Sequence, residues 1–441
     1  MTLPMSPTGG ANAPTLAPSE PRASIAVVPA VLLVACLVTF IQSFLPLKLA
    51  FIGLFLLMAF VSIVIRRRVV LYPRLVAFYV VFGVAAMVWA VIGLLQPGNF
   101  MQGNLEALRV YGAWSLAFIV LFTLLRSEAS PGAIHAAFVT AGILIAIINF
   151  VGLADIYAGW HLISDDVRKA LDQYIGFHEG YIQITSQNIG ALLVIVPYLI
   201  AIQLRADARG ARSGFMRVSL VLSLILAVAS GRRALWVVIA LAPCTILLLA
   251  LFTNSVGLIR RRVRRTLVIY TVVIALVPIV APVMPASIQE LSAVRRVRQA
   301  FSSEDARTIQ RPYLLAAFAR SPVLGSGFGA YAGYLRSHER PWTYELTYYK
   351  LLFSLGLVGF AVVGTLFGVY FLFVLRILQH FKQGSAVPFA MLVGWCSLLI
   401  GAYSNPYFGS FDYLFLLGLL PYLSTFGAGF QRPAPPQPGA G

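Results

Sequence analysis

The segment from Arg307 to Phe360 reads RTIQRPYLLAAFARSPVLGSGFGAYAGYLRSHERPWTYELTYYKLLFSLGLVGF, and the chain is organised around it. It combines arginines, a glycine-rich turn, a histidine, a glutamate and tyrosines, and then runs directly into an apolar span. The chain otherwise carries little charge, since 11% of its 441 residues are charged, against about 25% in soluble domains. We therefore interpret this segment as the chemically active part, held by a scaffold at one face of a membrane.

Apolar runs recur along the whole chain with short polar breaks. A helix needs about 20 mostly apolar residues to cross a bilayer. The pattern predicts an all-α polytopic membrane protein with about 12 transmembrane helices. The expected spans are residues 24–44, 47–65, 75–95, 109–125, 133–153, 187–204, 216–230, 234–253, 266–284, 346–375, 387–403 and 412–428.

The domain organisation follows from these runs. We expect a disordered cytoplasmic tail at 1–22, one membrane domain at 23–429 and a second disordered cytoplasmic tail at 430–441. The two largest outward-facing segments are 155–187 and 284–345, and the first of these is long enough for an interfacial helix. The acids after Asp165 lack the spacing and histidine pairing of a metal site, so we predict no metal.

The distribution of charge predicts the orientation. With both termini inside, arginines gather in the cytoplasmic segments, for example at 66–68 and 260–265, while the outer segments are mixed. The net charge of +18 therefore reflects membrane insertion. It argues against a nucleic-acid partner, which would need one basic binding face.

Residues 230–234 read SGRRA and lie between two apolar runs on the predicted outer face. Two arginines at that face oppose insertion, so they need a reason. Arg232 and Arg233 either snorkel to lipid head groups or form a pair of planar cations aimed at a phosphate. The residues alone leave both interpretations open.

The outer segment before the last long span contains a second group of candidates. Arg307 and Arg311 are spaced i, i+4, which places them on one side of a helix. We expect a new helix to begin at Pro312, with Arg311 at its edge, and to end at Pro322. The glycines from Gly325 to Gly329 predict a tight turn where backbone can approach a ligand closely.

Two candidate bases follow this turn. His338 is either a surface residue or a catalyst. Glu345 stands at the threshold of the next span, where a carboxylate loses solvation unless it is partnered. It is either a general base or one half of an ion pair with a nearby arginine.

Five short stretches together resemble the O-antigen ligase and O-antigen polymerase superfamily of bacterial surface-glycan enzymes. The likeness covers most of the chain from about Ser186 to Gly418, and the order of the stretches is its most specific feature. They are ITSQN at 184–188, SGRRA at 230–234, RPYLLAAFARSPVLGSGFG at 311–329, TYYKLLFSLGLVGF at 347–360 and, more weakly, SNPY at 404–407.

The resemblance implies a GT-C-like fold in the bacterial inner membrane with its active site at the periplasmic face. Such enzymes transfer a glycan from undecaprenyl diphosphate with inversion, and without metal, cofactor or nucleotide sugar. The acceptor is lipid A-core for a ligase and a second lipid-linked repeat unit for a polymerase.

The resemblance also assigns roles to residues. The family's essential arginine maps onto Arg232 or Arg233, and its loop arginine onto Arg311. A family histidine about eleven residues before the glycine of the following helix corresponds to Glu345 here, which leaves the base open between Glu345 and His338. We place Arg307, Asn188 and Tyr344 with the arginines as substrate-binding residues.

The chemistry is consistent with these residue types. A departing diphosphate develops negative charge that preorganised arginines can stabilise. It needs no acid, so a site richer in arginine than in paired carboxylates argues against glycoside hydrolysis.

Two alternative functions are also found among polytopic membrane proteins. The first alternative is a lipid-linked glycan flippase or small-solute transporter, but the span interiors lack a chain of ionisable groups. The second is a peptidoglycan polymerase of the shape, elongation and division type, whose motifs we do not find.

Overall fold

The structure is a computed structural model of the chain. The predicted tails and most of the predicted span at 266–284 lie outside the residues it describes, so the domain boundaries stay a prediction. The described residues are 25–67, 70–159, 162–178, 181–211, 213–259, 263–265, 267–269, 271–272, 306–380 and 386–429.

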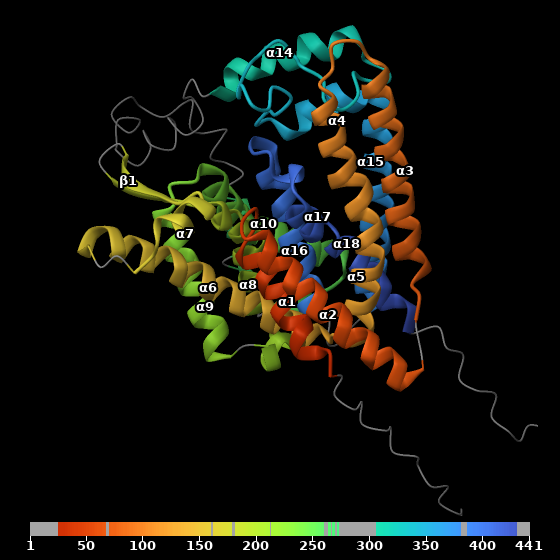
Figure 1. Ribbon diagram of the computed structural model, residues 1–441. Helices are drawn as coiled ribbons and strands as arrows, with labels where there is room; N and C mark the ends of the chain where they lie inside the picture. The colour runs from red at the N-terminus through yellow and green to blue at the C-terminus, as the bar shows by residue number, and fades with distance from the viewer. Residues whose placement is uncertain are drawn as a thin grey trace, which may run out of the picture.

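The described chain is mainly helical (Figure 1). Its α-helices are α1 (Val27–Thr39), α2 (Leu45–Arg66), α3 (Pro73–Leu95), α4 (Met101–Ala107), α5 (Trp114–Glu128), α6 (Pro131–Ala158), α7 (Asp165–Ala170), α8 (Leu192–Leu204), α9 (Gly214–Ala229), α10 (Arg233–Phe252), α14 (Ala306–Arg320), α15 (Thr347–His380), α16 (Ala386–Gly401), α17 (Phe411–Leu417) and α18 (Leu419–Leu423). Shorter helical segments are η1 (Leu108–Ala113), η2 (Gln187–Ala191), η3 (Ala206–Ala211), η4 (Val256–Leu258), η6 (Ala402–Ser404), η7 (Tyr407–Gly409) and η8 (Ser424–Gly429).

Seven helices of the described part are long and apolar enough to cross a membrane, and four shorter apolar helices accompany them. This confirms an all-α polytopic membrane protein in outline. Eleven of the twelve expected spans coincide with one of these helices, but the exact number of spans stays a prediction. The GT-C-like architecture and the side of the membrane that each end faces are likewise untested.

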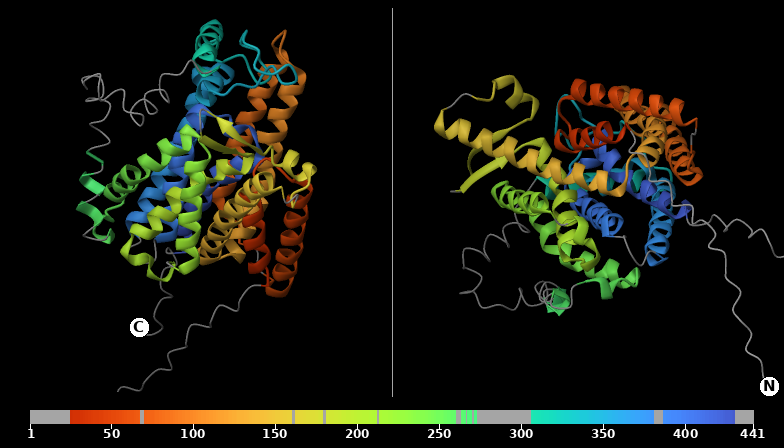
Figure 2. Two further views of the ribbon diagram at one scale, coloured as in Figure 1. Left: turned by 90° about the vertical axis from the view of Figure 1, so that its left-hand side faces the viewer. Right: turned by 90° about the horizontal axis from the view of Figure 1, so that it is seen from below.

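A β-hairpin interrupts the helical pattern in the outer segment at 155–187. Strand β1 (Tyr174–His178) pairs antiparallel with β2 (Tyr181–Thr185), so that Ile175 faces Ile184 across the ladder. The expected interfacial helix is limited to the short α7, because the following residues are rich in aromatic and β-branched types that favour strands. The end of α6, α7 and the hairpin extend to one side of the bundle (Figure 2).

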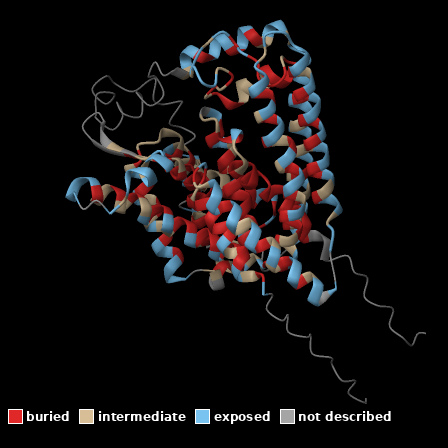
Figure 3. Ribbon diagram, viewed as in Figure 1, coloured by how far each residue is buried: buried red, intermediate tan, exposed pale blue. Residues whose placement is uncertain are grey.

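The centre of the bundle is the pair α8 and α16, and both helices are buried over most of their length (Figure 3). Glycines allow the two backbones to approach closely, as is common between membrane helices. A Cβ atom on Gly394 would lie 2.8 Å from a Val194 methyl group, and one on Gly401 would lie 2.8 Å from Leu193.

A buried ion pair fixes the first two helices against α17. Lys48 Nζ lies 2.8 Å from Asp412 Oδ2, and each side chain is only 1% exposed. The backbone N–H of Gln42 donates to the same oxygen at 2.8 Å. Because removing one partner would leave the other charged group buried alone, this contact holds residues 42–48 in place.

The 34-residue helix α15 is broken at Gly356, where φ is 63° and ψ is −173°. The break leaves backbone N–H and C=O groups of the helix without their usual hydrogen-bond partners. In a membrane, such groups need partners within the protein. The predicted glycine-rich turn supplies them. Ser326 and Gly327 donate to the carbonyls of Phe353 and Ser354 at 3.0 and 2.9 Å, while Leu357 and Val358 donate to the carbonyls of Pro322 and Val323 at 2.8 and 3.0 Å.

The same turn also packs on α3. Gly325, Gly327 and Gly329 all have φ near 75°, and a Cβ on Gly327 would overlap the backbone of Gly93. Trp89 Nε1 donates to the carbonyl of Leu324 at 2.9 Å. The close backbone approach expected for a ligand is therefore used mainly for docking the turn between α3 and α15.

The helix α14 also differs from the expectation in its start. It runs through Pro312 without ending, so Arg307 and Arg311 lie in one helix one turn apart. Pro312 has no N–H to donate to the carbonyl of Thr308, so the helix continues there without that hydrogen bond. The helix lies at one end of the molecule, near α4 and the first turns of α15 (Figures 1 and 2).

The docking predicts that Gly356→Ala destabilises the protein. A Cβ there would overlap the backbone of Gly325 and Val323, and a non-glycine residue at this φ and ψ costs about 1–3 kcal/mol by itself. Gly368→Ala is the matched control, because a Cβ at Gly368 in the same helix meets nothing within 4 Å. Thermal unfolding in detergent should show a lower midpoint for Gly356→Ala than for Gly368→Ala, and equal midpoints would contradict the docking.

Candidate functional site

A polar cavity of about 460 Å³ lies between α4, the segment 328–343 and the first turns of α15. It is lined by Gln42, Gly103, Glu106, Ala107, Val110, Tyr111, Phe328, Gly329, Ala330, Arg336, Ser337, Arg340, Trp342, Thr343, Thr347, Lys350, Leu351, Ser354, Pro406, Phe408 and Gly409.

The charged groups of this cavity are one carboxylate and three cations. Trp342 Nε1 donates to Glu106 Oε2 at 3.1 Å, and Arg340 lies 3.5 Å from Glu106 Oε1. Lys350 lines the cavity too, and within the described part of the chain no ion pair joins it to a carboxylate. With Arg336, the cavity carries a net positive charge, which suits a phosphate or another anion.

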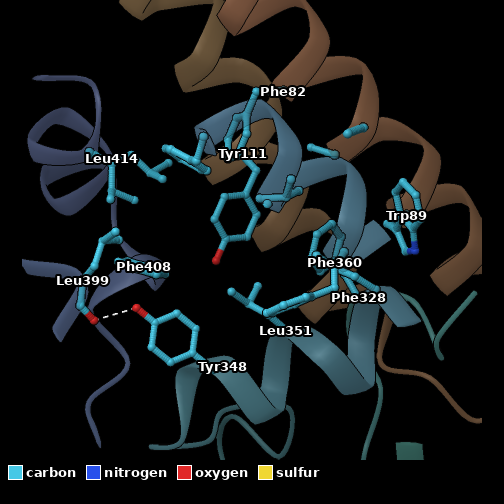
Figure 4. A pocket seen from close by; sticks show the side chains of 17 residues that line it. Phe82, Trp89, Tyr111, Phe328, Tyr348, Leu351, Phe360, Leu399, Phe408 and Leu414 are labelled. Atoms are coloured by element: carbon cyan, nitrogen blue, oxygen red, sulfur yellow. Dashed lines mark hydrogen bonds between the residues drawn. The ribbon is translucent and has the colours of Figure 1, made fainter. Parts of the chain in front are cut away.

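An apolar cavity of about 200 Å³, drawn in Figure 4, shares lining residues with the polar one and so adjoins it. Residues of α3, η1, α15 and the chain around α16 and α17 surround it, and Tyr111 projects into the space (Figure 4). Tyr348 donates to the carbonyl of Leu399 at 2.5 Å, which satisfies its hydroxyl inside this apolar surface. The residues common to both cavities are Tyr111, Phe328, Leu351 and Phe408. The two cavities together therefore fit an amphiphilic molecule with a polar head and an apolar chain.

Glu345 is ion-paired, which was one of the two possibilities that the sequence left open. Arg307 Nε lies 3.0 Å from Glu345 Oε2, and Arg336 lies 3.2 Å from Oε1. The backbone N–H of Glu345 donates to Gln310 Oε1 at 3.0 Å. These contacts join α14, the loop and the start of α15. Arg336 also lines the polar cavity, so Glu345 is linked to the cavity through this arginine.

Arg311 lies on α14 beside two tyrosines. Its guanidinium is 5.7 Å from the centre of the Tyr349 ring, and the rings of Tyr349 and Tyr403 are 6.5 Å apart. The side chain of Arg311 is exposed. Arg311 therefore places an exposed cation over an aromatic surface, next to Tyr403 at the start of residues 403–413.

Arg232 and Asn188 lie in a separate polar cluster. The turn before α10 needs Gly231, whose φ is 62°, and it directs Arg232 Nη2 to the carbonyl of Ser186 at 2.7 Å. Ser186 Oγ donates to Asn188 Oδ1 at 2.5 Å, and Asn149 Nδ2 donates to the same atom at 3.1 Å. Arg233 is the half-buried first residue of α10.

Residues 403–413 connect this cluster to the polar cavity. Thr347 Oγ1 donates to the carbonyl of Asn405 at 2.5 Å on the cavity side. On the other side, the rings of Tyr407 and Tyr413 are 4.7 Å apart, and Arg232 acts electrostatically on Tyr413. Asn405 and Tyr407 of the SNPY stretch therefore contact residues on both sides, Thr347 of the polar cavity and Tyr413 near Arg232.

His338 and Tyr344 lie in different surroundings from the cavity. His338 is exposed and lines neither cavity. Tyr344 is fully buried, and its hydroxyl accepts a hydrogen bond from Ala332 N–H at 2.7 Å. Burial raises the pKa of Tyr344 to about 12. Its geometry thus holds the loop together, and its expected contact with substrate stays untested.

The lining of the polar cavity was not predicted from the sequence. Glu106, Arg336, Arg340, Trp342 and Lys350 were not among the expected site residues. Glu106 was visible as a carboxylate in a short segment on the predicted outer face, which was a usable signal. Within the described residues, no three His, Cys, Asp or Glu side chains cluster in a way that could hold a metal ion.

Part of the chain is similar to a known protein family. Residues 218–364 match the family described as O-antigen ligase. This part of the chain is therefore similar to the O-antigen ligase family. This confirms the resemblance predicted from the sequence, and it supports a membrane enzyme of the O-antigen ligase or polymerase type.

The match runs from α9 into α15 and includes three of the quoted stretches, SGRRA, RPYLLAAFARSPVLGSGFG and TYYKLLFSLGLVGF. The ITSQN and SNPY stretches lie outside it. The matched region thus contains α14, the loop and the break of α15, whereas Glu106 and residues 403–413 lie outside it. No significant match to a curated protein was found.

The contact of Tyr344 predicts a structural effect of Tyr344→Phe. The substitution leaves the buried Ala332 N–H without an acceptor, which costs about 1–3 kcal/mol, so the loop 321–346 should open more readily to limited proteolysis. Tyr331→Phe is the control, because Tyr331 is 41% exposed in the same loop. Equal cleavage rates in both variants would contradict this role.

Proposed function

We propose that this protein transfers a glycan from an undecaprenyl-diphosphate-linked donor to a sugar acceptor at the periplasmic face of the bacterial inner membrane. The observation that carries the proposal is the polar cavity that adjoins an apolar one through four shared residues. A lipid-linked glycan has the matching two-part chemistry. The match to the O-antigen ligase family supports the same class of reaction.

The prenyl chain would lie against the apolar cavity, whose walls include Phe82, Ala86 and Leu414. Burial of each methylene group there contributes about 0.8 kcal/mol. The diphosphate would then lie in the polar cavity beside Lys350 and Arg336. The boundary between the lipid chain and the diphosphate would then lie at the shared lining residues, which include Tyr111 and Leu351.

The predicted arginines complete the site in this proposal. Arg307 shares Glu345 with Arg336, so it can hold the cation at the cavity edge in position. Arg311 lies over the ring of Tyr349, which is next to Tyr403. Arg232 acts electrostatically on Tyr413. With Arg233 these two arginines would bind the glycan, while the diphosphate lies beside Lys350 and Arg336.

Cations are needed because negative charge develops on the leaving diphosphate during the reaction. When the bond from the anomeric carbon to the diphosphate breaks, the leaving group gains negative charge. Guanidinium and ammonium groups already held in place stabilise that charge without reorganisation.

The function is tested by supplying the purified protein with lipid-linked glycan. Extension of lipid-linked repeat units alone would identify a polymerase, and transfer that requires lipid A-core would identify a ligase. Absence of glycan transfer under both conditions would contradict the proposal.

Arg311→Ala and Arg232→Ala should each lower transfer by about 10- to 100-fold, because losing one hydrogen bond from a charged group to the glycan costs about 1.5–3 kcal/mol. Arg320→Ala is the matched control, since Arg320 is the exposed last residue of α14. Amounts of membrane-inserted protein should be equal in all three variants. Normal transfer by both Arg311→Ala and Arg232→Ala would show that these arginines have no part in the reaction.

Ala86→Phe should lower transfer from a long-chain donor about tenfold, because displacing about two methylene groups costs about 1.6 kcal/mol. A donor with a short prenyl chain should be affected less. Val81→Phe is the control, since Val81 lies on the same helix and is 45% exposed. Equal effects on both donors would place the lipid chain elsewhere.

A further inference from the structure

The polar cavity contains one carboxylate and no imidazole among its lining residues, and that carboxylate is Glu106. Neither His338 nor Glu345 lines this cavity. We propose that Glu106 is the base that receives the proton of the acceptor hydroxyl during glycan transfer. This inference rests on the proposed function and names a residue outside the O-antigen ligase match, which begins at residue 218.

The structure orients the Glu106 carboxylate from one side. Trp342 is 5% exposed, its ring packs 5.6 Å from that of Phe100, and its Nε1 donates to Glu106 Oε2 at 3.1 Å. A Cβ on Gly103, one turn before Glu106, would lie 2.8 Å from the Trp342 ring and 2.7 Å from Gly329. The helix α4 is therefore pressed against the loop, and the carboxylate has a fixed direction.

The other contacts leave the carboxylate able to accept a further hydrogen bond. Arg340 lies 3.5 Å from Glu106 Oε1, but its side chain is 60% exposed, so the pair is weak and exchanges with water. A carboxylate has about four acceptor positions, and these two contacts use two of them. A sugar hydroxyl in the cavity can therefore reach Glu106.

Glu345 is in a different situation. Each of its oxygens is paired with an arginine, Arg307 on one side and Arg336 on the other. Proton transfer to Glu345 would break both pairs. Its geometry fits a positioning residue that directs Arg336 towards the cavity.

The charged and titratable groups around Glu106 come from three elements. Arg336 and Arg340 belong to the loop, Lys350 belongs to α15, and Tyr111 belongs to η1. Glu106 acts electrostatically on both Lys350 and Tyr111. The base and the cations that would stabilise the leaving group thus share one cavity.

The step balances without a further reactant. The acceptor oxygen forms a bond to the anomeric carbon while the bond from that carbon to the diphosphate breaks. The electron pair leaves with the lipid diphosphate, which Lys350 and Arg336 stabilise. The hydroxyl proton passes to Glu106, which later releases it to water.

The test compares Glu106→Gln, Glu106→Asp, Glu345→Gln and Glu339→Gln with the wild type, using lipid-linked glycan and acceptor. Glu106→Gln should lower kcat by about 100- to 10,000-fold, the range for loss of a general base, with both KM values nearly unchanged. It should also lose the acidic limb of the pH–rate profile, which Glu106→Asp should retain at reduced rate. Glu345→Gln should keep that limb. Glu339→Gln, in the exposed part of the loop, should match the wild type.

Thermal unfolding in detergent checks that Glu106→Gln is folded, and Glu106→Asp provides a second active-site variant. A Glu106→Gln variant with wild-type kcat would overturn the proposal, and so would one that changed only a KM. Loss of the acidic limb in Glu345→Gln, with the limb intact in Glu106→Gln, would assign the base to Glu345 instead. A wild-type protein that transfers no glycan would overturn the proposed function, and this role with it.

Discussion

The contact on which the site depends is the insertion of the glycine-rich turn into the break of α15. Gly356 interrupts a helix that is otherwise apolar and long enough to cross a membrane, and the freed backbone groups bind to residues 322–327. In a lipid environment such groups cannot turn to water, so the turn and the break require each other. The glycines at both positions are needed because any side chain would separate the two backbones.

The polar cavity follows from this insertion. Once residues 325–329 are fixed between α3 and α15, the chain that follows must return over α4, and it brings Trp342 onto Glu106. Arg336 and Glu345 are then held near α14 and the first turn of α15. The apolar cavity lies on the other side of Tyr111 and Phe328, so one docking event creates a boundary between polar and apolar chemistry.

The sequence predicted what depends on composition along the chain. Apolar length located eleven of the described helices, and the SGRRA stretch was correctly assigned to a turn between two of them. The ion pair of Glu345 was one of two options, since a carboxylate at the start of a span needs a partner. The hairpin at 174–185 was not predicted, because the charged residues at 165–172 indicate an interfacial helix and the aromatic and β-branched residues of the strands follow them directly.

Contacts between distant residues could not be predicted in this way. Trp342 and Glu106 are separated by 236 positions, and only the packed fold brings them together. The glycine-rich turn was recognised, but its partners Gly93 and Gly356 were not, because a glycine does not specify what approaches it. The separation of Arg232 from the polar cavity by residues 403–413 likewise depends on tertiary packing. An experimental structure in a lipid nanodisc with a bound, non-transferable lipid-diphosphate glycan analogue would test the central claim most directly. The account predicts a diphosphate beside Lys350 and Arg336, with the prenyl chain along Tyr111 and Leu351. A diphosphate bound elsewhere, with both cavities empty, would contradict it.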